Sequence, residues 1–542
     1  MNRREFLAWM GMGAAGLLAR RAIAQTPPAA APQSPAGAKA KGPNLLIIHT
    51  DEHNFRTLGC YRALMSPDQA TVWGKQGVLD TPNIDRIAKD GAVCTKFYAT
   101  TPVCSPSRSA FMTGRYPQNT PVTTNDLPMS DEVVTFAEVL RRGGYATGYA
   151  GKWHLDGPGK PQWAPKRQFG FADNRYMYNR GHWKKLEDTP AGPAVASRSA
   201  AGQPNYDVKG ADEKSFTTDF LAGKTIDFIR AHKDEPFCFM VSIPDPHGPN
   251  TVRPPYDTMF NGMTFEAPRT MSKPASAVAA WAPKQVASLA AENMHKYFGM
   301  VKCIDDNVGR ILGELDKLAL TERTVVVFTS DHGDLCGEHG RFNKGVPYET
   351  SAKVPFIIRA PGKIKPGTVV GEALGCVDFA PTILALMGQP APSDAQGRDA
   401  SGLLVGKAPA DWKDITFFRS TSASRNAPGN WLAAATKRYK LVVSPIEKPW
   451  LFDLEKDPDE VANYLDDPAC RDVLRQLARD LLAYGKKYGD PDVDDPPVKA
   501  DLQWAAEGTG PYVSPARRAT QPAKAGKAGK KAAKKAKQTA EE

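Results

Sequence analysis

Short apolar runs alternate with longer amphipathic segments over most of this 542-residue chain. Segments typical of strands are residues 44–49, 145–150, 237–243, 324–329 and 354–359. Between them, apolar residues recur three and four positions apart, as they do in helices, at residues 83–89, 135–142, 220–231, 297–318 and 377–387. Strands that alternate with helices indicate an α/β fold. We therefore predict, over residues 43–405, a mixed, largely parallel sheet flanked by helices.

The pattern changes after about residue 405. Short strand-like pieces follow at 431–435 and 440–443, and a helical period appears at 473–484. We predict a smaller α+β subdomain over residues 406–495, followed by an extension over 496–515.

The two ends of the chain have a different composition. Residues 1–24 contain Arg3 and Arg4, an apolar stretch to Leu18 and a small-residue cleavage site, so they resemble a twin-arginine export signal; a short membrane anchor is the alternative. Residues 25–42 have linker composition, and residues 516–542 form a Lys/Ala-rich tail. We expect both to be disordered, although the tail could also tether the protein to a surface or a polyanion. The predicted location is periplasmic or secreted.

The net charge of +11 comes from these ends. The formal charge is +5 over residues 1–41 and +7 over residues 516–542, which leaves −1 for residues 42–515. No nucleic-acid partner is therefore expected. No later segment reaches the ~20 apolar residues that span a bilayer. The eight cysteines show neither zinc-site nor disulfide-framework spacing.

Polar side chains follow four of the predicted strands at the point where each strand ends. Each of them alone could be a helix cap or a structural polar residue. If the strands are parallel, however, they deliver these side chains to one edge of the sheet, where α/β folds bind ligands. In chain order the residues are Asp51 and Glu52, Lys152 and His154, His247, and Asp331 and His332.

These residue types indicate hydrolysis of a tetrahedral oxyanion ester. A carboxylate-rich ligand set favours a hard cation, Ca²⁺ or Mg²⁺, and the candidate ligands are Asp51, Glu52, Asp331 and His332. Lys152 and Lys344 can hold an anionic substrate, and His154 and His247 can transfer protons.

The segment Cys104–Arg108, with the sequence Cys-Ser-Pro-Ser-Arg, is followed by Thr113-Gly114-Arg115. This pattern resembles the signature of type I sulfatases, in which the cysteine is oxidised to formylglycine. A structural role for Cys104 as a small buried side chain leaves the rest of the match unexplained. The resemblance continues at residues 151–154, 246–249, 330–334, 342–345 and 451–454, and covers roughly residues 43–490.

The resemblance to the formylglycine-dependent sulfatases implies an alkaline-phosphatase-like α/β fold with a small C-terminal sheet domain. In that family's chemistry, residue 104 is a hydrated formylglycine. One of its hydroxyls attacks sulfur while the ester oxygen leaves, and the other expels sulfate. The implied metal ligands are Asp51, Asp331, His332 and residue 104. The other implied roles are that Arg108 orients the diol, Lys152 and Lys344 bind sulfate, His154 acts as base, and His247 protonates the leaving oxygen.

Two positions differ from many relatives, which have aspartate where this chain has Glu52 and asparagine where it has His332. Whether Glu52 binds the metal stays open. The expected function is an exported sulfatase for sulfated glycans or small sulfate esters. Its expected partners are a formylglycine-generating enzyme and the export machinery. The alternatives are a phosphate or phosphonate ester hydrolase of the same superfamily, and a non-catalytic glycan- or polyanion-binding protein.

Overall fold

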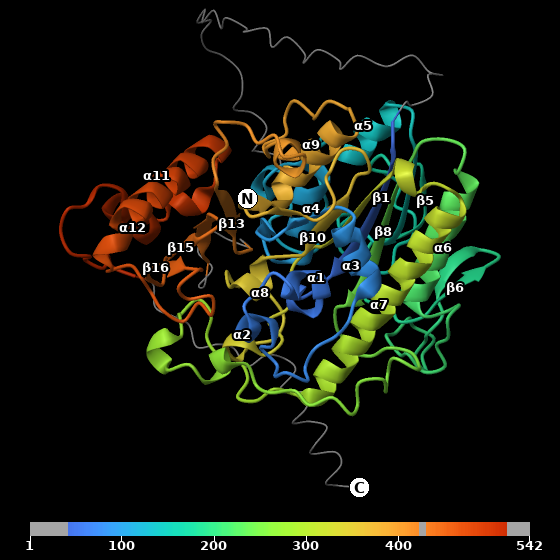
Figure 1. The fold of residues 1–542 in the computed structure, drawn as a ribbon, viewed down its shortest axis with the longest axis horizontal. Coiled ribbons are helices and arrows are strands. Elements are labelled where there is room, and N and C mark those ends of the chain that lie inside the picture. The colour runs from blue at the N-terminus through green and yellow to red at the C-terminus, as the bar shows by residue number, and fades with distance from the viewer. Residues whose placement is uncertain (1–41, 422–429, 518–542) are drawn as a thin grey trace, which may run out of the picture. The chain divides into compact units, whose positions relative to one another are not determined.

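The computed structural model describes residues 42–421 and 430–517. An eight-stranded sheet with the order β11-β2-β10-β9-β1-β8-β4-β5 forms the larger part of the fold (Figure 1). Its strands are β1 (Asn44–Asp51), β2 (Ala92–Cys94), β4 (Ala146–Lys152), β5 (Asp173–Tyr178), β8 (Phe237–Pro246), β9 (Thr324–Ser330), β10 (Phe356–Arg359) and β11 (Thr368–Val370). All neighbours pair in parallel except β10, which is antiparallel to β9 and β2. The sheet is therefore mixed and largely parallel, as predicted.

Helices cover both faces of this sheet. In β1 the apolar run alternates between two cores: Leu45 and Ile47 pack into one, and Leu46 and Ile48 into the other. A strand that is buried on both faces in this way needs a continuous apolar sequence. One face is covered by α4 (Cys104–Thr113), α5 (Phe136–Arg142) and α9 (Cys376–Leu386), and the other by α3 (Pro82–Lys89), α6 (Thr217–Ala231) and α7 (Ala291–Lys317).

Short elements complete this part of the chain. Two small ladders pair β3 (Phe97–Tyr98) with β12 (Leu374–Gly375), and β6 (Leu186–Thr189) with β7 (Gly192–Val195). The short helices are α1 (Gly59–Arg62), α2 (Pro67–Ala70), α8 (Glu349–Ala352) and α10 (Ser401–Leu404).

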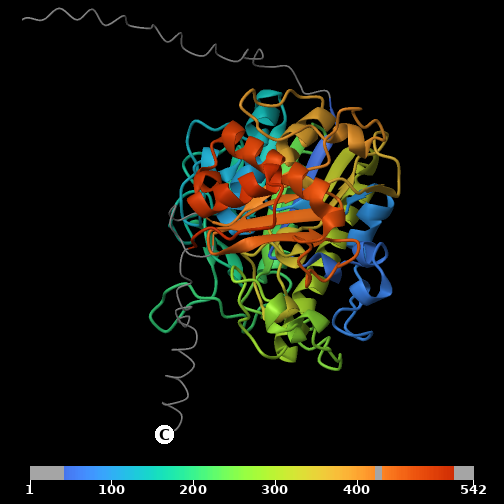
Figure 2. The same cartoon turned by 90° about the vertical axis from the view of Figure 1, so that its left-hand side faces the viewer.

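A separate antiparallel sheet lies towards the C-terminal end (Figure 2). It contains β13 (Thr416–Arg419), β14 (Leu432–Ala435), β15 (Tyr439–Ser444) and β16 (Glu447–Asp453) in sequence order. One face packs against α11 (Arg471–Tyr488) and α12 (Pro496–Glu507). The other face packs on side chains of the larger part, including Tyr98 and Tyr348.

Some elements differ from the sequence prediction. The strands β2 and β11 have three residues each, which is too short to show a period. In β5, at the edge of the sheet, exposed polar residues alternate with buried residues over the first half of the strand. The region predicted as an extension contains α12. The predicted signal peptide, linker and tail lie outside the described residues, apart from a few residues at their edges.

Candidate active site

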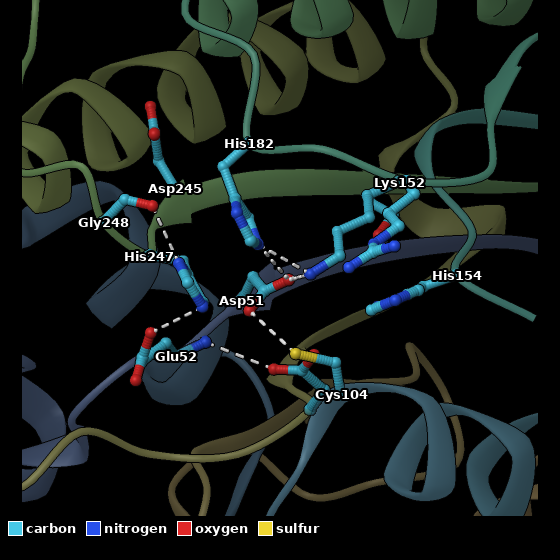
Figure 3. A network of polar contacts seen from close by, with 12 residues as sticks. Asp51, Glu52, Cys104, Lys152, His154, His182, Asp245, His247 and Gly248 are labelled. Carbon is cyan, nitrogen blue, oxygen red and sulfur yellow. Dashed lines mark hydrogen bonds and ion pairs between the residues drawn. The ribbon is translucent and has the colours of Figure 1, made fainter. Parts of the chain in front are cut away.

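Polar side chains gather at the carboxyl edge of the main sheet, where β1, β4, β8 and β9 end. These four strands are mutually parallel, so the segments after them leave the sheet at the same edge. Hydrogen bonds and ion pairs connect residues from all four strand ends (Figure 3). The connected residues are Asp51, Glu52, Lys152, His247, Asp331 and His332.

Four buried side chains at this edge could hold a metal ion: the ligand atoms of Asp51, Cys104, Asp331 and His332 all lie within 4.8 Å of one another. The Sγ atom of Cys104 is 3.2 Å from Nε2 of His332 and 3.8 Å from a carboxylate oxygen of Asp51. Burial would raise the pKa of Asp51, but the charge of Lys152 and the other neighbouring cations hold it well below its usual value. The carboxylate is therefore available as a ligand.

Glu52 lies beside this group and is not a member of it. Its Oε2 is 3.0 Å from Nε2 of His247 and 3.1 Å from Nζ of Lys344. Burial opposes the charged form, yet His247 and Lys344 lower the pKa of Glu52 to about 2. The second oxygen, Oε1, is buried and has no hydrogen-bond partner among the described residues. One carboxylate oxygen of Glu52 thus pairs with two cationic side chains, while the other oxygen has no hydrogen-bond donor among the described residues.

Arg108 hydrogen-bonds residues at the ends of several strands of the main sheet. Its guanidinium is buried and donates to Asp331 at 2.9 Å and to Asp51 at 3.0 Å. It also donates to the carbonyl of Lys152 at 2.9 Å and to Oγ of Ser242 at 2.8 Å. A planar guanidinium can make all four bonds at once, which an ammonium cannot.

Cys104 is the first residue of α4, so its side chain lies at the positive end of a ten-residue helix. Ser107, one turn further on, donates to the carbonyl of Asp331 at 2.5 Å and fixes the helix to the end of β9. Burial and the nearby charge of Asp51 would raise the pKa of the Cys104 thiol. The cations Lys152, Lys344 and His332 outweigh both effects and lower it.

A stack of two histidines stands between the two lysines. The rings of His182 and His247 are parallel, with centroids 3.6 Å apart. Nζ of Lys152 is 2.8 Å from Nε2 of His182 and also contacts Asp51, and Nζ of Lys344 is 2.6 Å from Nε2 of His247. Asp51, His182 and His247 are close enough to form a second metal group. The ammonium of Lys152 contacts two of the three, so this group is already satisfied by a cation of the chain itself.

The surroundings of His247 favour its protonated form. Nδ1 faces the carbonyl oxygen of Gly248 at 2.9 Å, and Nε2 faces the carboxylate of Glu52 at 3.0 Å. Both of these partners only accept, which favours donation from both ring nitrogens, as in an imidazolium. The ammonium of Lys344, 2.6 Å from Nε2, acts in the opposite direction. Burial would lower the pKa of His247, but the charge of Glu52 raises it above the usual value.

His154 lies two positions after Lys152, just beyond the end of β4, and Figure 3 shows it among the residues of the site. Its backbone has a positive φ of 61°. Nε2 is 3.0 Å from Oδ1 of Asp126, whereas Nδ1 is buried and has no partner among the described residues. Nothing in the sequence pointed to Asp126, because it lies in an irregular loop outside every motif.

Gly151, the residue before Lys152, allows the end of β4 to pass close to β8, and this places Lys152 at the site. Its φ is +106°, and a Cβ atom added there would lie 1.9 Å from the carbonyl oxygen of Ser242 on the neighbouring strand. Only glycine fits such a contact. The close approach of β4 and β8 sets the position of Lys152.

Three further residues near the predicted site contact core or backbone-supporting residues and so have structural roles. The His49 ring packs edge-on against Phe111, and burial first of all lowers its pKa to about 3. His53 hydrogen-bonds Thr50 and Thr57, and Trp183 is buried in the second core. From the sequence alone, His49, His53, His182 and Trp183 could each line a substrate pocket, and a structural role is at least as consistent with their positions. Of the four, His182 contacts Lys152 and His247 of the site.

Comparison with known families agrees with this geometry. The family model described as "Sulfatase" matches residues 43–389, and the model "N-sulphoglucosamine sulphohydrolase, C-terminal" matches residues 337–487. The first match covers more than half of the chain and includes every residue of the site. This chain belongs to the sulfatase family. It is therefore a sulfuric ester hydrolase.

Several relatives of this sulfatase are themselves sulfatases with a named substrate. An N-acetylglucosamine-6-O-sulfatase of Bacteroides thetaiotaomicron is 26% identical, over 85% of this chain and 89% of the relative. A ulvan-active sulfatase of Formosa agariphila is 28% identical, over 83% and 82%. The fold is shared more widely: a solved phosphonate monoester hydrolase of Agrobacterium radiobacter superposes with a TM-score of 0.64 at 24% identity, over 83% of this chain and 97% of that one.

Two further observations concern the described part of the sulfatase outside the site. All eight cysteines are unpaired. Among residues 42–421 and 430–517, no helix is long and apolar enough to cross a bilayer.

Proposed function

We propose that this sulfatase hydrolyses sulfate esters of glycans through a formylglycine made from Cys104, with a bound divalent cation. The position of Cys104 carries the proposal. The cysteine of the signature is buried at the start of α4, and its sulfur faces His332 and Asp51. A cysteine that served only to pack the core would have apolar neighbours.

The residues around position 104 fit a hard cation. Two carboxylates of the buried group are joined by the imidazole of His332, and conversion of Cys104 would replace its sulfur by oxygen. The buried, unpartnered Oε1 of Glu52 is a further oxygen that a cation would satisfy. This donor set favours Ca²⁺, with Mg²⁺ as the alternative. A cation bound there would lower the free energy of the charge that develops on the sulfuryl oxygens.

The remaining polar residues have roles that follow from their charge and position. Lys152 and Lys344 stand on either side of the histidine stack, where two ammonium groups can hold a sulfate group. Arg108 fixes the carboxylate ligands and the strand ends. Protonated His247 can donate to the leaving oxygen, and His154 can accept a proton from residue 104. Hydrated formylglycine supplies two hydroxyl groups on one carbon, one to attack sulfur and one whose deprotonation releases sulfate.

A panel of sulfated mono- and oligosaccharides, assayed for sulfate release, tests the substrate class. The names of two relatives, the N-acetylglucosamine-6-O-sulfatase and the ulvan-active sulfatase, lead us to expect sulfated sugars to react faster than small aryl or alkyl sulfates. Peptide mass spectrometry should show residue 104 as an aldehyde, and Cys104→Ala should abolish turnover. Full activity of that variant would overturn the mechanism.

A phosphonate or phosphate ester hydrolase is the second candidate, because the two lysines and a cation would suit either oxyanion and a phosphonate hydrolase shares the fold. Matched aryl sulfate, phosphate and phosphonate esters separate the two. Faster turnover of the phosphorus esters would favour this alternative.

We also propose that the protein is exported by the twin-arginine route to the periplasm or the medium, after a formylglycine-generating enzyme has acted on it. Arg3 and Arg4 in the N-terminal segment support this. Replacing both by lysine should leave active enzyme in the cytoplasm, which cell fractionation measures.

A further inference from the structure

We propose that Asp126 is a positioning residue, which holds His154 in the tautomer whose Nδ1 accepts a proton from residue 104. The inference deepens the role proposed above for His154 and depends on it. Asp126 belongs to an irregular loop before α5 and to none of the motifs in the sequence.

The carboxylate of Asp126 is shared between two donors. Oδ1 lies 3.0 Å from Nε2 of His154, and Oδ2 lies 3.1 Å from the guanidinium of Arg180. A carboxylate paired with a guanidinium is ionised and can only accept, so Nε2 of His154 must carry a proton and donate it. In a neutral imidazole this leaves Nδ1 as the acceptor.

Nδ1 has nothing to accept from in the described residues. The atom is buried, and the His154 side chain is 5% exposed. A buried acceptor without a partner is rare in folded proteins, so a hydrogen-bond donor from a substrate or a modified side chain is expected to face it. Ser105, the residue after Cys104, hydrogen-bonds the carbonyl of His154, so a hydroxyl on the modified residue 104 is the group that we assign to Nδ1.

The loop that carries Asp126 is fixed to the helix that carries the nucleophile. Oδ1 of Asn125 accepts the backbone N–H of Ser105 at 2.9 Å, within the first turn of α4. Oγ of Ser105 donates to the carbonyl of His154 at 2.7 Å. Asp126 itself has a φ of +69°, which aspartate tolerates better than most residues. Hydrogen bonds therefore connect the loop of Asp126, the first turn of the helix that begins at residue 104, and His154.

The proton transfer balances without a further reactant. A hydroxyl proton of modified residue 104 moves to Nδ1, and the electron pair of the O–H bond stays on the oxygen. His154 becomes an imidazolium, which the ionised carboxylate of Asp126 stabilises without taking the proton. A positioned carboxylate of this kind orients the base and favours its charged form.

The first test measures the tautomer directly. The intact, modified, Ca²⁺-loaded enzyme is labelled with ¹⁵N-histidine, and a difference spectrum against His154→Gln identifies the His154 signal among nine histidines. We expect a proton on Nε2 in the wild type and in Asp126→Asn, which keeps an acceptor oxygen. Asp126→Ala should lose this preference. Asp131→Asn is the matched control, because Asp131 lies in the same loop and its side chain is 88% exposed. A proton on Nδ1 in the wild type, or an unchanged tautomer in Asp126→Ala, would overturn the proposal.

The second test is kinetic. Asp126→Ala should lower kcat about 10- to 100-fold with little change in KM, and Asp126→Asn should recover part of the loss. Unchanged kcat in Asp126→Ala would contradict a positioning role. If the wild type released no sulfate from any sulfate ester, the proposed function would fail, whereas the tautomer measurement would still decide the role of Asp126.

Discussion

Replacing Gly151 by alanine tests whether the spacing of β4 and β8 sets the position of Lys152. The added Cβ would lie 1.9 Å from the carbonyl oxygen of Ser242, and real Cβ contacts do not come closer than 3.0 Å. The two strands must therefore separate locally by about 1.1 Å, which is the difference between these distances. A displacement of about 1 Å at a catalytic group can lower the rate about 10²-fold. Lys152 follows immediately, so we expect kcat/KM to fall by about that factor.

Gly157→Ala is the matched control. Gly157 lies six positions further on, also has a positive φ, +75°, and a Cβ there meets nothing within 4 Å. Both variants should lose about 1–2 kcal/mol of unfolding free energy from the backbone conformation. The clash should cost Gly151→Ala roughly 1–3 kcal/mol more. Initial rates with an aryl sulfate and urea unfolding measure the two quantities. Equal kcat/KM in the two variants would refute the argument.

Three further perturbations test the charges of the site. Glu52→Gln removes the carboxylate that raises the pKa of His247, so the imidazolium should lose its proton at lower pH and the alkaline limb of the kcat/KM profile should move to lower pH; an unchanged limb would speak against His247 as the proton donor. Arg108→Met leaves Asp51 and Asp331 buried without their guanidinium, and urea unfolding at fixed metal concentration should show a loss of about 3–5 kcal/mol, with a loss below about 1 kcal/mol arguing against a buried ion-pair role. Removing divalent cations with a chelator should lower the melting temperature, and Ca²⁺ at 100 times its Kd should restore about 2.7 kcal/mol; a melting temperature that does not respond to either would exclude a cation at this site.

The strands that carry the site could be read from the sequence because burial on both faces demands an unbroken apolar run. The runs after Asn44 and after Thr324 are of this kind, and both became central parallel strands. The short strands β2 and β11 could not be found, because three residues show no period and their pairing is set by neighbours far away in the chain. The helix α12 begins with two prolines, in a region whose sequence predicts only an extension.

The chemistry of the site divides in a similar way. The sequence alone determined the residue types: a signature cysteine, carboxylates, lysines and histidines placed after strands, and with them the family. The sequence could also predict that these residues share one site, because parallel strands place the residues that follow them at the same edge of the sheet, whatever the details of packing.

Tertiary structure decided which of these residues touch. Glu52 was a candidate metal ligand in the sequence, and in the fold one of its oxygens pairs with His247 and Lys344 while the other stays free. The sequence marked His182 only as a residue that could line a pocket or have a structural role, and it gave no signal for Asp126. They come to the site from loops whose paths depend on long-range contacts, and the directions of their side chains are set by partners that no local pattern encodes.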